Sequence, residues 1–500
     1  MQVKSAAKLQ MMFFAAKQME VLADMIGRER EVNELLQLYN GKKAELVAIY
    51  GRRRVGKTYL VDETFRGKIT FRHAGLSPVE ENKKGFLKAQ LEHFYYSLLL
   101  QGMKKSHRPE SWLEAFYMLE TFLEERNDGD RQVVFLDELP WLDSPRSGFM
   151  TAFEGFWNTW GCHRSNLMVI VCGSASSWMK DALINNHGGL YNRVTYIIKL
   201  SPFVLRECEA FFAETNVRLS RYDIVQSYMA LGGIPYYLGY FESGLSLAQN
   251  MDKLFFSKQA KLREEYDRLF SSVFDSPEYV RAIVEVLYTR NAGYTRKEIL
   301  AKLCIQDGSR LSESLHALMA SDFVVKYVPF GFSKREEHYK LVDPFCLFWL
   351  HFVKGRDVTD EHFWSNSQLS QFIVSWRGFA FEQVCFNHIE QIKLALGISG
   401  VKTAQSAWSK KDDDTDGTQI DLLIERGDNV LNCCEIKFCG SDFVLDREYY
   451  KTILRRQEIL LKEVSPKVSL ESVLITTFGL APNEYAGCFS NVITLKQLFL

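Results

Sequence analysis

Short apolar runs alternate with stretches of helical spacing over the first two hundred residues. The runs at 45–50, 131–137 and 166–172 have the length and composition of buried strands. Helical spacing then continues from about residue 201 to 270. This order predicts an α/β fold, in which a parallel sheet has helices on both faces and a helical lid follows.

Three helices and a hairpin are predicted next, within residues 273–350. One helix covers 277–288 with Ser276 as its N-cap, and a second begins after Thr295, which lies three residues before Glu298. A third covers 309–319, and a hairpin begins at residue 322. This order is typical of a winged helix-turn-helix.

A winged helix can contact DNA or serve as a rigid packing module. In the first case Arg310 would face DNA, and Lys334 and Arg335 of the wing would contact phosphates. Glu313 and the scarcity of other positive charge on the third helix favour the packing module.

The last third of the chain contains a second strand pattern. Residues 418–424 alternate as a strand, 427–429 form a turn, and 430–438 form the returning strand. In such a hairpin Asp421 and Glu435 can lie near each other, and Glu435 and Lys437 project from one face of their strand.

Composition narrows the class of protein. The net charge of −1 excludes a uniformly basic nucleic-acid binder. Ten scattered cysteines without a CxxC pair indicate a reduced, cytoplasmic interior and no structural zinc. No apolar run is long enough for a membrane span, and residues 1–24 lack the apolar core of a signal peptide, so we expect an N-terminal extension there.

A phosphate-binding loop follows the first predicted strand. Its GxxxxGK[ST] sequence comprises Gly51, Arg52, Arg53, Arg54, Val55, Gly56, Lys57 and Thr58, with Tyr59 next. Backbone amides and the helix dipole would hold the phosphates, Lys57 would add a charge at the β- and γ-phosphates, and Thr58 would ligate Mg²⁺. We therefore expect ATP and Mg²⁺ as ligands.

The second and third strands end in polar residues that complete this chemistry. Asp137 would hold Mg²⁺ through its water shell, and Glu138 would orient and deprotonate the attacking water. Ser174, after the third strand, would sense the γ-phosphate or the water, although a turn residue is an equally good interpretation.

These motifs together resemble the AAA+ ATPases, and within them a prokaryotic group related to archaeal ATPases and the STAND class. The resemblance rests on IGRE at 26–29, GRRRVGKT, VVFLDE, VCGS and GGIP at 232–235. It implies that Ile26 packs near the adenine and that Pro235 of the lid touches the base. Arg193 would be a phosphate-sensing or finger arginine, although a surface arginine fits as well. A finger arginine usually acts across a subunit interface, which would require a homo-oligomer that the sequence itself does not show.

The C-terminal acids indicate separate chemistry. Asp421 and Glu435 at bonding distance repel each other unless one is protonated or a divalent cation lies between them. Lys437 would then orient or polarise the water that attacks a phosphodiester. The alternative is a solvated hairpin face with an incidental acid pair.

This arrangement resembles the PD-(D/E)xK nuclease superfamily, which has a restriction-endonuclease-like core. Asp421 matches the first acid, Glu435-Ile436-Lys437 the ExK motif, and Glu382 the upstream helix glutamate. No proline precedes Asp421, which is a departure from the pattern. The resemblance implies catalytic roles for these four side chains, with Asp421 and Glu435 also as metal ligands. On the following helix, the stripe Arg447, Lys451 and Arg455 fits a solvated face better than a DNA contact.

The predicted organisation is an N-terminal extension (1–24), a P-loop AAA+ core (25–200), a helical lid (201–272), a winged helix (273–350) and a nuclease-like domain (351–500). Our first hypothesis is an ATPase whose nucleotide state controls a metal-dependent nuclease acting on DNA. The second is a signalling ATPase in which the nuclease fold is catalytically silent and serves recognition. A DNA-binding regulator that acts through the winged helix is the third.

Overall fold

The computed structural model describes residues 25–77, 85–185, 189–190, 192–274, 276–333, 336–356, 360–412 and 415–500, and the side chains of 409–417 are not described. The predicted extension over 1–24 and the wing residues Lys334 and Arg335 lie outside this set. The chain forms two compact units: the first comprises the residues up to Ser201 together with Ser272–Asp275, and the second comprises 202–271 and 276–500. Within the described ranges, no helix combines the length and the apolar character needed to cross a bilayer.

The first unit is built on five parallel strands in the order β2-β3-β4-β1-β5. Their bounds are β1 Glu45–Tyr50, β2 Ile69–Ala74, β3 Gln132–Asp137, β4 Leu167–Gly173 and β5 Tyr196–Lys199. The three strands predicted from the apolar runs are β1, β3 and β4, so the predicted parallel sheet is confirmed. Because β4 lies between β1 and β3, its carboxyl end separates the phosphate-binding loop from the acids after β3.

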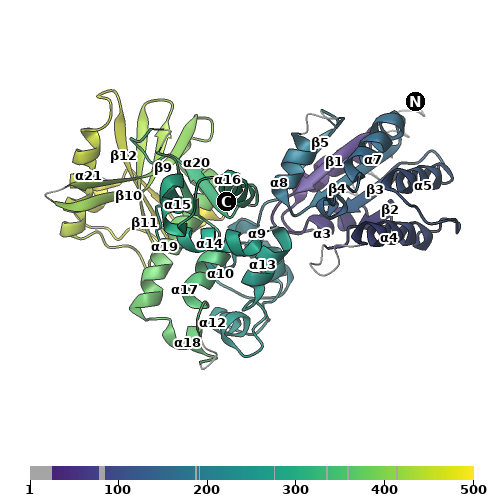
Figure 1. Cartoon of the computed structure of the whole chain (residues 1–500). Helices are drawn as coiled ribbons and strands as arrows, with labels where there is room; N and C mark the ends of the chain where they lie inside the picture. The colour runs from purple at the N-terminus through teal and green to yellow at the C-terminus, as the bar shows by residue number, and fades with distance from the viewer. Residues whose placement is uncertain are drawn as a thin grey trace, which may run out of the picture. The chain divides into compact units, whose positions relative to one another are not determined.

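Helices cover both faces of this sheet (Figure 1). Leu46 and Ala48 of β1 join one core with residues of α4, α5 and α7, whereas Val47 and Ile49 are fully buried on the opposite face. This double burial explains why β1 reads as a continuous apolar run. The helices are α2 Glu29–Tyr39, α3 Lys57–Thr64, α4 Phe86–Leu100, α5 Trp112–Glu124, α6 Leu139–Leu142, α7 Phe149–Gly155, η2 Phe156–Trp160, η3 Gly161–His163, α8 Ser176–Trp178 and η4 Met179–Ile184.

The second unit begins with a helical segment, as the sequence predicts. Its elements are α9 Leu205–Glu214, α10 Arg221–Leu231, α11 Pro235–Leu238, α12 Leu247–Met251, η5 Asp252–Phe256 and α13 Glu265–Val273. Ser220 caps α10 and Ser246 caps α12, each through its hydroxyl group.

Three helices and an antiparallel hairpin follow, which we call the helix–hairpin segment (residues 276–341). Its elements are α14 Pro277–Tyr288, β6 Tyr294–Thr295, α15 Arg296–Leu303, α16 Ser309–Ala320, β7 Val324–Tyr327 and β8 His338–Leu341. The predicted capping box is present, because Thr295 accepts from the Glu298 amide and Glu298 accepts from the Thr295 amide. Ser276 holds the N-cap position of α14 but makes no side-chain capping bond. The identity of the segment as a winged helix stays a prediction.

The remainder of the second unit contains a mixed sheet in the order β13-β12-β11-β10-β9. Strands β9, β10 and β11 pair antiparallel, and β12 and β13 run parallel to β11. The strand bounds are β9 Thr403–Asp412, β10 Thr415–Arg426, β11 Val430–Lys437, β12 Ser469–Thr476 and β13 Asn491–Ile493. The helices are α17 Pro344–Phe352, α18 Phe363–Ser367, α19 Gln371–Asn387, α20 Ile389–Ala395, α21 Arg447–Leu461, η7 Ala486–Cys488 and α22 Leu495–Leu498. The predicted hairpin is therefore β10–β11, and α21 connects β11 to β12.

An aromatic stack joins the helical segment to this sheet. The ring of Tyr222 on α10 lies 4.9 Å from that of Phe438 at an interplanar angle of 13°. It also lies 5.6 Å from the ring of Phe478 at 27°. Phe438 and Phe478 follow the carboxyl ends of β11 and β12, so α10 packs where these two strands end.

Candidate functional site: a phosphate-binding loop and a separate carboxylate cluster

Two glycines shape the loop after β1. Gly51 has φ of 151°, and a β-carbon there would lie 2.2 Å from the backbone oxygen of Leu200. Gly56 has φ of 93° and precedes Lys57, the first residue of α3. Both positions require a backbone that side-chain-bearing residues rarely adopt, which explains the glycines of the motif.

The Lys57 ammonium is held inside this loop. It donates to the backbone oxygens of Gly51 at 3.0 Å and Arg52 at 3.1 Å, and to Ser174 Oγ at 3.3 Å. Burial lowers the pKa of Lys57, and the charge of Glu138 opposes this effect. The loop thus directs a desolvated positive charge into the place where phosphates are expected.

Thr58 and Asp137 form the oxygen pair that a magnesium ion requires. Thr58 Oγ1 donates to Asp137 Oδ2 at 2.7 Å, across from α3 to the end of β3. Burial raises the pKa of Asp137, and the hydrogen bond from Thr58 counteracts this rise. A hydroxyl and a carboxylate oxygen in contact beside the loop fit the hard-oxygen preference of Mg²⁺.

Glu138 is fixed by Ser174. Its backbone has φ of 47° and ψ of 50°, a left-handed conformation that costs a glutamate on the order of 1 kcal/mol. Its two carboxylate oxygens accept from the Ser174 amide at 3.0 Å and from the Ser174 hydroxyl at 2.5 Å. Because β4 lies between β1 and β3, Ser174 contacts both Lys57 and Glu138. We call these five residues (Lys57, Thr58, Asp137, Glu138 and Ser174) the P-loop network.

The other residues predicted at the nucleotide site are not part of the P-loop network. Arg52 and Val55 are buried and Arg53 and Arg54 half-buried in the loop, whereas the Tyr59 side chain is exposed. Arg193 is exposed in the loop before β5 and contributes to none of the P-loop network contacts. Ile26 lies in the turn before α2, and Pro235 begins α11 in the second unit, so its predicted contact with the base stays untested.

Arg28 belongs to the IGRE motif before α2, but the sequence indicated no role for its side chain. It is buried, and it donates to the backbone oxygen of Ser201 at 2.7 Å and to that of Val55 at 3.4 Å. The guanidinium thereby ties the loop to the end of the first unit.

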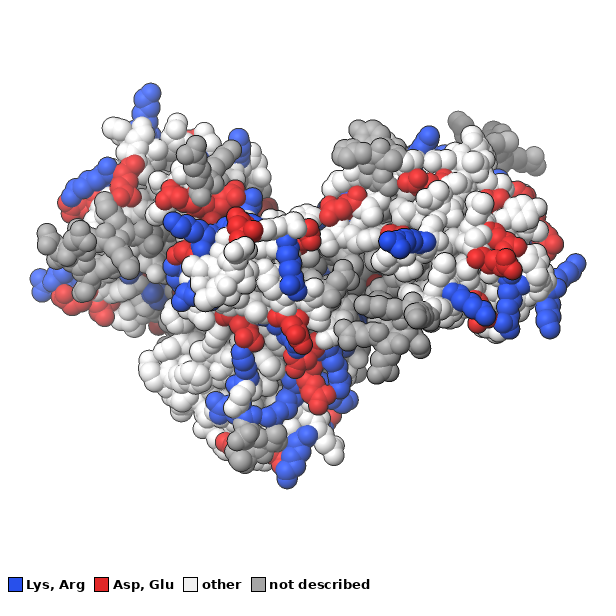
Figure 2. Space-filling view, in the orientation of Figure 1, with Lys and Arg blue, Asp and Glu red and all other residues white. Residues whose placement is uncertain are grey.

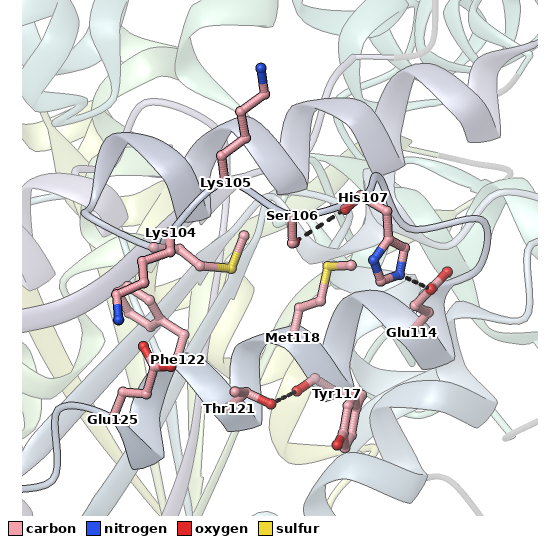
Figure 3. A pocket seen from close by; sticks show the side chains of 11 residues that line it. Lys104, Lys105, Ser106, His107, Glu114, Tyr117, Met118, Thr121, Phe122 and Glu125 are labelled. Carbon is pink, nitrogen blue, oxygen red and sulfur yellow. Dashed lines mark hydrogen bonds and ion pairs between the residues drawn. The ribbon is translucent and has the colours of Figure 1, made fainter.

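A pocket of about 370 Å³ lies elsewhere in the first unit, between the loop after α4 and helix α5. Its walls combine apolar side chains with the hydrogen-bonded pair of His107 and Glu114, whose nitrogen and oxygen are 2.6 Å apart (Figure 3). No residue of the P-loop network lines it. The pocket is therefore separate from the predicted nucleotide site.

The C-terminal residues that the sequence singled out do converge. Leu422 pairs with Cys434 between β10 and β11, and this register, continued by one residue, sets Asp421 opposite Glu435. Asp421 Oδ2 accepts from the Ile436 amide at 3.4 Å. Burial raises the pKa of Asp421, and the charge of Glu435 adds to the effect. We call Glu382, Asp421 and Glu435 the carboxylate cluster.

Protein cations neutralise Glu435, whereas the sequence led us to expect either a protonated acid or a divalent cation at this pair. Arg456 Nη1 lies 2.8 Å from Glu435 Oε1, and Tyr449 donates its hydroxyl to Oε2 at 2.5 Å. Lys437 Nζ lies 3.8 Å from Oε2, so Glu435 and Lys437 do share the α21 face of the strand, as predicted. Among the described residues, no group of three or more His, Cys, Asp or Glu side chains is arranged to hold a metal ion. In this arrangement the cluster does not fit the predicted metal.

The helix–hairpin segment also reaches the cluster. Asn291 donates to Glu382 Oε2 at 3.3 Å. Burial lowers the pKa of Lys340 on β8, and the charges of Glu382 and Asp421 oppose this effect. Burial, followed by the charge of Asp421, raises the pKa of Glu382 to about 7. No sequence pattern indicated Lys340, Asn291 or Arg456, because each reaches the cluster from a distant element.

Of the residues considered for DNA contact, the structure describes Arg310 on α16 and the stripe on α21. Arg310 is stacked on the Tyr279 ring, its guanidinium 4.2 Å from the ring centre. The stripe of Arg447, Lys451 and Arg455 is exposed, as expected for a solvated face. On the face seen in Figure 2, basic and acidic side chains are interspersed rather than gathered by sign.

The first half of the chain matches a known protein family. Residues 25–241 match the family described as an ATPase domain predominantly from Archaea. An uncharacterized protein of Methanocaldococcus jannaschii is 24% identical over 441 residues, which cover 87% of this chain and 92% of the relative.

Two solved structures are similar over about two thirds of the chain. The Walker-type ATPase of Pyrococcus abyssi is 20% identical with a TM-score of 0.45, covering 66% of this chain and 96% of that one. The ORC2 protein of Aeropyrum pernix is 14% identical with a TM-score of 0.39, covering 69% and 96% respectively. With its family match, parallel sheet and P-loop, the chain carries an archaeal-type P-loop ATPase domain over residues 25–241.

Proposed function

We propose that the chain is an ATP-hydrolysing AAA+ type switch whose nucleotide state controls a nuclease-like centre acting on DNA. The observation that carries the ATPase half is the P-loop network, in which Lys57, the Thr58–Asp137 pair and Glu138 lie at the carboxyl ends of neighbouring strands. The convergence of Glu382, Asp421, Glu435 and Lys437 supports the second half.

The chain's own residues supply most of the hydrolytic chemistry. The loop amides and Lys57 bind and orient the β- and γ-phosphates. Thr58 and Asp137 would hold Mg²⁺, which supplies neutralisation of the charge that develops on the phosphates. Glu138 accepts a proton from the attacking water while the water oxygen bonds to the γ-phosphorus and the bond to the bridging oxygen breaks. Ser174 keeps the Glu138 carboxylate in place through hydrogen bonds from its backbone amide and its hydroxyl group.

Two variants test this half. Lys57→Ala removes the phosphate-facing charge, so nucleotide binding should weaken. Glu138→Gln preserves the shape of the side chain and an acceptor for the Ser174 amide, so binding should persist while turnover falls by about 10²- to 10⁴-fold. Nucleotide affinity by fluorescence and phosphate release by a coupled assay separate the two effects. Turnover at the parental rate in the glutamine variant would reject the role given to Glu138.

For the C-terminal half, the test is cleavage of plasmid or linear DNA by the full chain with Mg²⁺ or Mn²⁺, with and without ATP. We expect cleavage to depend on Glu435 and on nucleotide. Cleavage that is unaffected by Glu435→Ala rejects the catalytic assignment. The mixed sheet with a crossover helix between β11 and β12 also supports the resemblance to the PD-(D/E)xK core.

A second function is favoured by the ion pair between Arg456 and Glu435. In that case the chain is a signalling ATPase in which the nuclease-like fold is silent and serves recognition. DNA that stays intact under every nucleotide condition, together with ATP turnover that changes when DNA is added, would support this function over the first.

A further inference from the structure

One nitrogen of the Arg28 guanidinium holds two peptide groups from distant parts of the chain. Its Nη2 donates to the backbone oxygen of Ser201 at 2.7 Å and to that of Val55 at 3.4 Å. Val55 belongs to the phosphate-binding loop, and Ser201 is the last residue before the second unit. Because a guanidinium can only donate, both carbonyl oxygens are held toward it.

On the loop side, this bond determines the direction of an amide. The oxygen of Val55 and the N–H of Gly56 belong to one planar trans peptide group, so they point in opposite directions. A Val55 oxygen that is drawn toward Arg28 therefore turns the Gly56 amide away from Arg28. The Gly56 amide is one of the loop amides that we expect to hold the phosphates. Arg28 is thus placed to orient a phosphate-binding donor without touching the phosphate itself.

On the other side, the bond holds the segment of residues 200–203, which we call the linker. At its first residue the linker is packed on the loop, since a β-carbon on Gly51 would lie 2.2 Å from the Leu200 oxygen. At its last residue, the Phe203 amide donates to the Gly233 oxygen at 2.8 Å. A β-carbon on Gly233 would in turn lie 2.2 Å from the Phe203 oxygen. Each end of the linker is therefore held against a glycine.

Pro202 makes the linker stiff between these two ends. Its ring fixes its own φ and restricts Ser201 to an extended backbone. The Ser201 oxygen and the Pro202 nitrogen share one planar peptide group, so a bond that holds this oxygen also holds the proline. A displacement of the Ser201 oxygen is then passed on to Phe203 and to its hydrogen bond with Gly233.

We propose that Arg28 is a positioning residue that couples phosphate binding at the loop to the position of the linker. A phosphate on the Gly56 amide stabilises the peptide group that Arg28 contacts, and Arg28 in turn holds the linker at Ser201. Because such coupling is reciprocal, the same bonds raise the affinity for nucleotide. The inference deepens the proposed function and rests on it for its purpose, since a nucleotide-controlled switch needs a connection from the loop to the rest of the chain.

The first measurement is the affinity of the full chain for ADP with Mg²⁺, followed with a fluorescent ADP analogue. Arg28→Met removes the donors and keeps most of the apolar stem, so the Gly56 amide loses its fixed orientation. We expect ADP to bind about tenfold more weakly, because a hydrogen bond from a charged donor is lost. Arg30→Met is the matched control and should leave the affinity unchanged, since Arg30 is an exposed residue of α2 that pairs with Glu34 at 3.0 Å.

The second measurement is hydrogen exchange of the Phe203 amide, without ADP and at saturating ADP. Pro202 has no amide hydrogen, so Phe203 is the first reporter after Ser201. In the parental chain, saturating ADP should slow this exchange about fivefold or more, whereas in Arg28→Met it should leave the exchange unchanged. A residue that only stabilised the fold would change the exchange equally with and without ADP, so the lost response distinguishes coupling from stability.

Three results would overturn the inference. One is an unchanged ADP affinity in a folded Arg28→Met chain, and another is a variant that keeps the parental response of Phe203 to saturating ADP. The third is a parental chain whose Phe203 amide does not respond to ADP, which decides the question even if the variants fail to fold. Arg28→Gln is a second neutral variant, and circular dichroism checks the fold of both.

Neither measurement requires hydrolysis or DNA cleavage. If both expected results are found in a chain that hydrolyses no ATP and cuts no DNA, Arg28 is retained as the coupling residue and the proposed function is rejected. If a chain with ATP turnover and nucleotide-dependent cleavage shows no response of Phe203 to ADP, the proposed function is retained and the coupling by Arg28 is rejected.

Discussion

The fully buried His388 should make the second unit sensitive to acid. It lies between α19 and α20, and its Nε2 accepts from the Leu205 amide, at the start of α9, at 3.0 Å. An amide can only donate, so the ring proton must be on Nδ1, which donates to the Val384 oxygen at 2.8 Å. Protonation of Nε2 would break the bond to Leu205 and place a charge in the core.

The size of the effect follows from the pKa of this ring. Burial lowers the pKa of His388 from 6.5 to about 4. A depressed folded-state pKa means that the unfolded chain binds the proton first, so stability is retained above pH 6.5 and lost as pH falls toward 4. Between pH 7.5 and pH 5 the loss should be about 2 kcal/mol.

Urea unfolding at these two pH values measures the loss. His388→Gln cannot titrate and should remove about 2 kcal/mol of the difference between the two pH values. His362→Gln, at an exposed histidine, is the matched control and should leave the difference unchanged. If the His388 variant and the parental chain lose equal stability on acidification, the assignment of the buried neutral ring is wrong.

Three further predictions concern the two functional regions. Gly51→Ala should lower the free energy of unfolding by about 3 kcal/mol, because φ is 151° and a β-carbon would lie 2.2 Å from a backbone oxygen. Gly67→Ala is the control and should cost less, because nothing lies near its β-carbon. Ser174→Ala should lower ATP turnover about tenfold with unchanged nucleotide affinity, because the hydrogen bond from the Ser174 hydroxyl to the Glu138 carboxylate is lost. Turnover equal to the parental value would contradict this. Arg456→Met should destabilise the chain by about 2 kcal/mol in thermal or urea unfolding, and adding Glu435→Gln should restore most of that.

The first unit was largely predictable from sequence because short, continuous stretches of the chain determine its strands and its phosphate-binding loop. The strand over 45–50 and the helix that begins at Lys57 follow from a continuous apolar run, two glycines and a fixed motif. The position of Ser174 between Lys57 and Glu138 required the strand order, in which β4 separates β1 from β3. Apolar runs alone do not specify that order.

The acids of the C-terminal cluster and Lys437 were predicted from sequence, whereas Lys340 and Arg456 were not. The hairpin pattern indicated Asp421 and Glu435, because the two strands are adjacent in sequence. The helix stripe indicated Arg455, which is exposed, whereas the next residue, Arg456, turns inward to Glu435. An exposed arginine and an inward-facing arginine look alike in the sequence, so only the packing of α21 distinguishes Arg455 from Arg456. Lys340 was missed because β8 is distant in sequence from the strands that carry the acids.

The Tyr222 stack limits how strongly the helical segment can influence the C-terminal sheet through this contact. Each of its two aromatic contacts contributes on the order of 1 kcal/mol beyond area burial. If both were made in one nucleotide state and lost in the other, their sum of about 2 kcal/mol would bias a two-state equilibrium about thirtyfold. A regulatory ratio above that value would have to draw on additional contacts, so the measured ratio shows whether this aromatic contact alone is a sufficient transmitter.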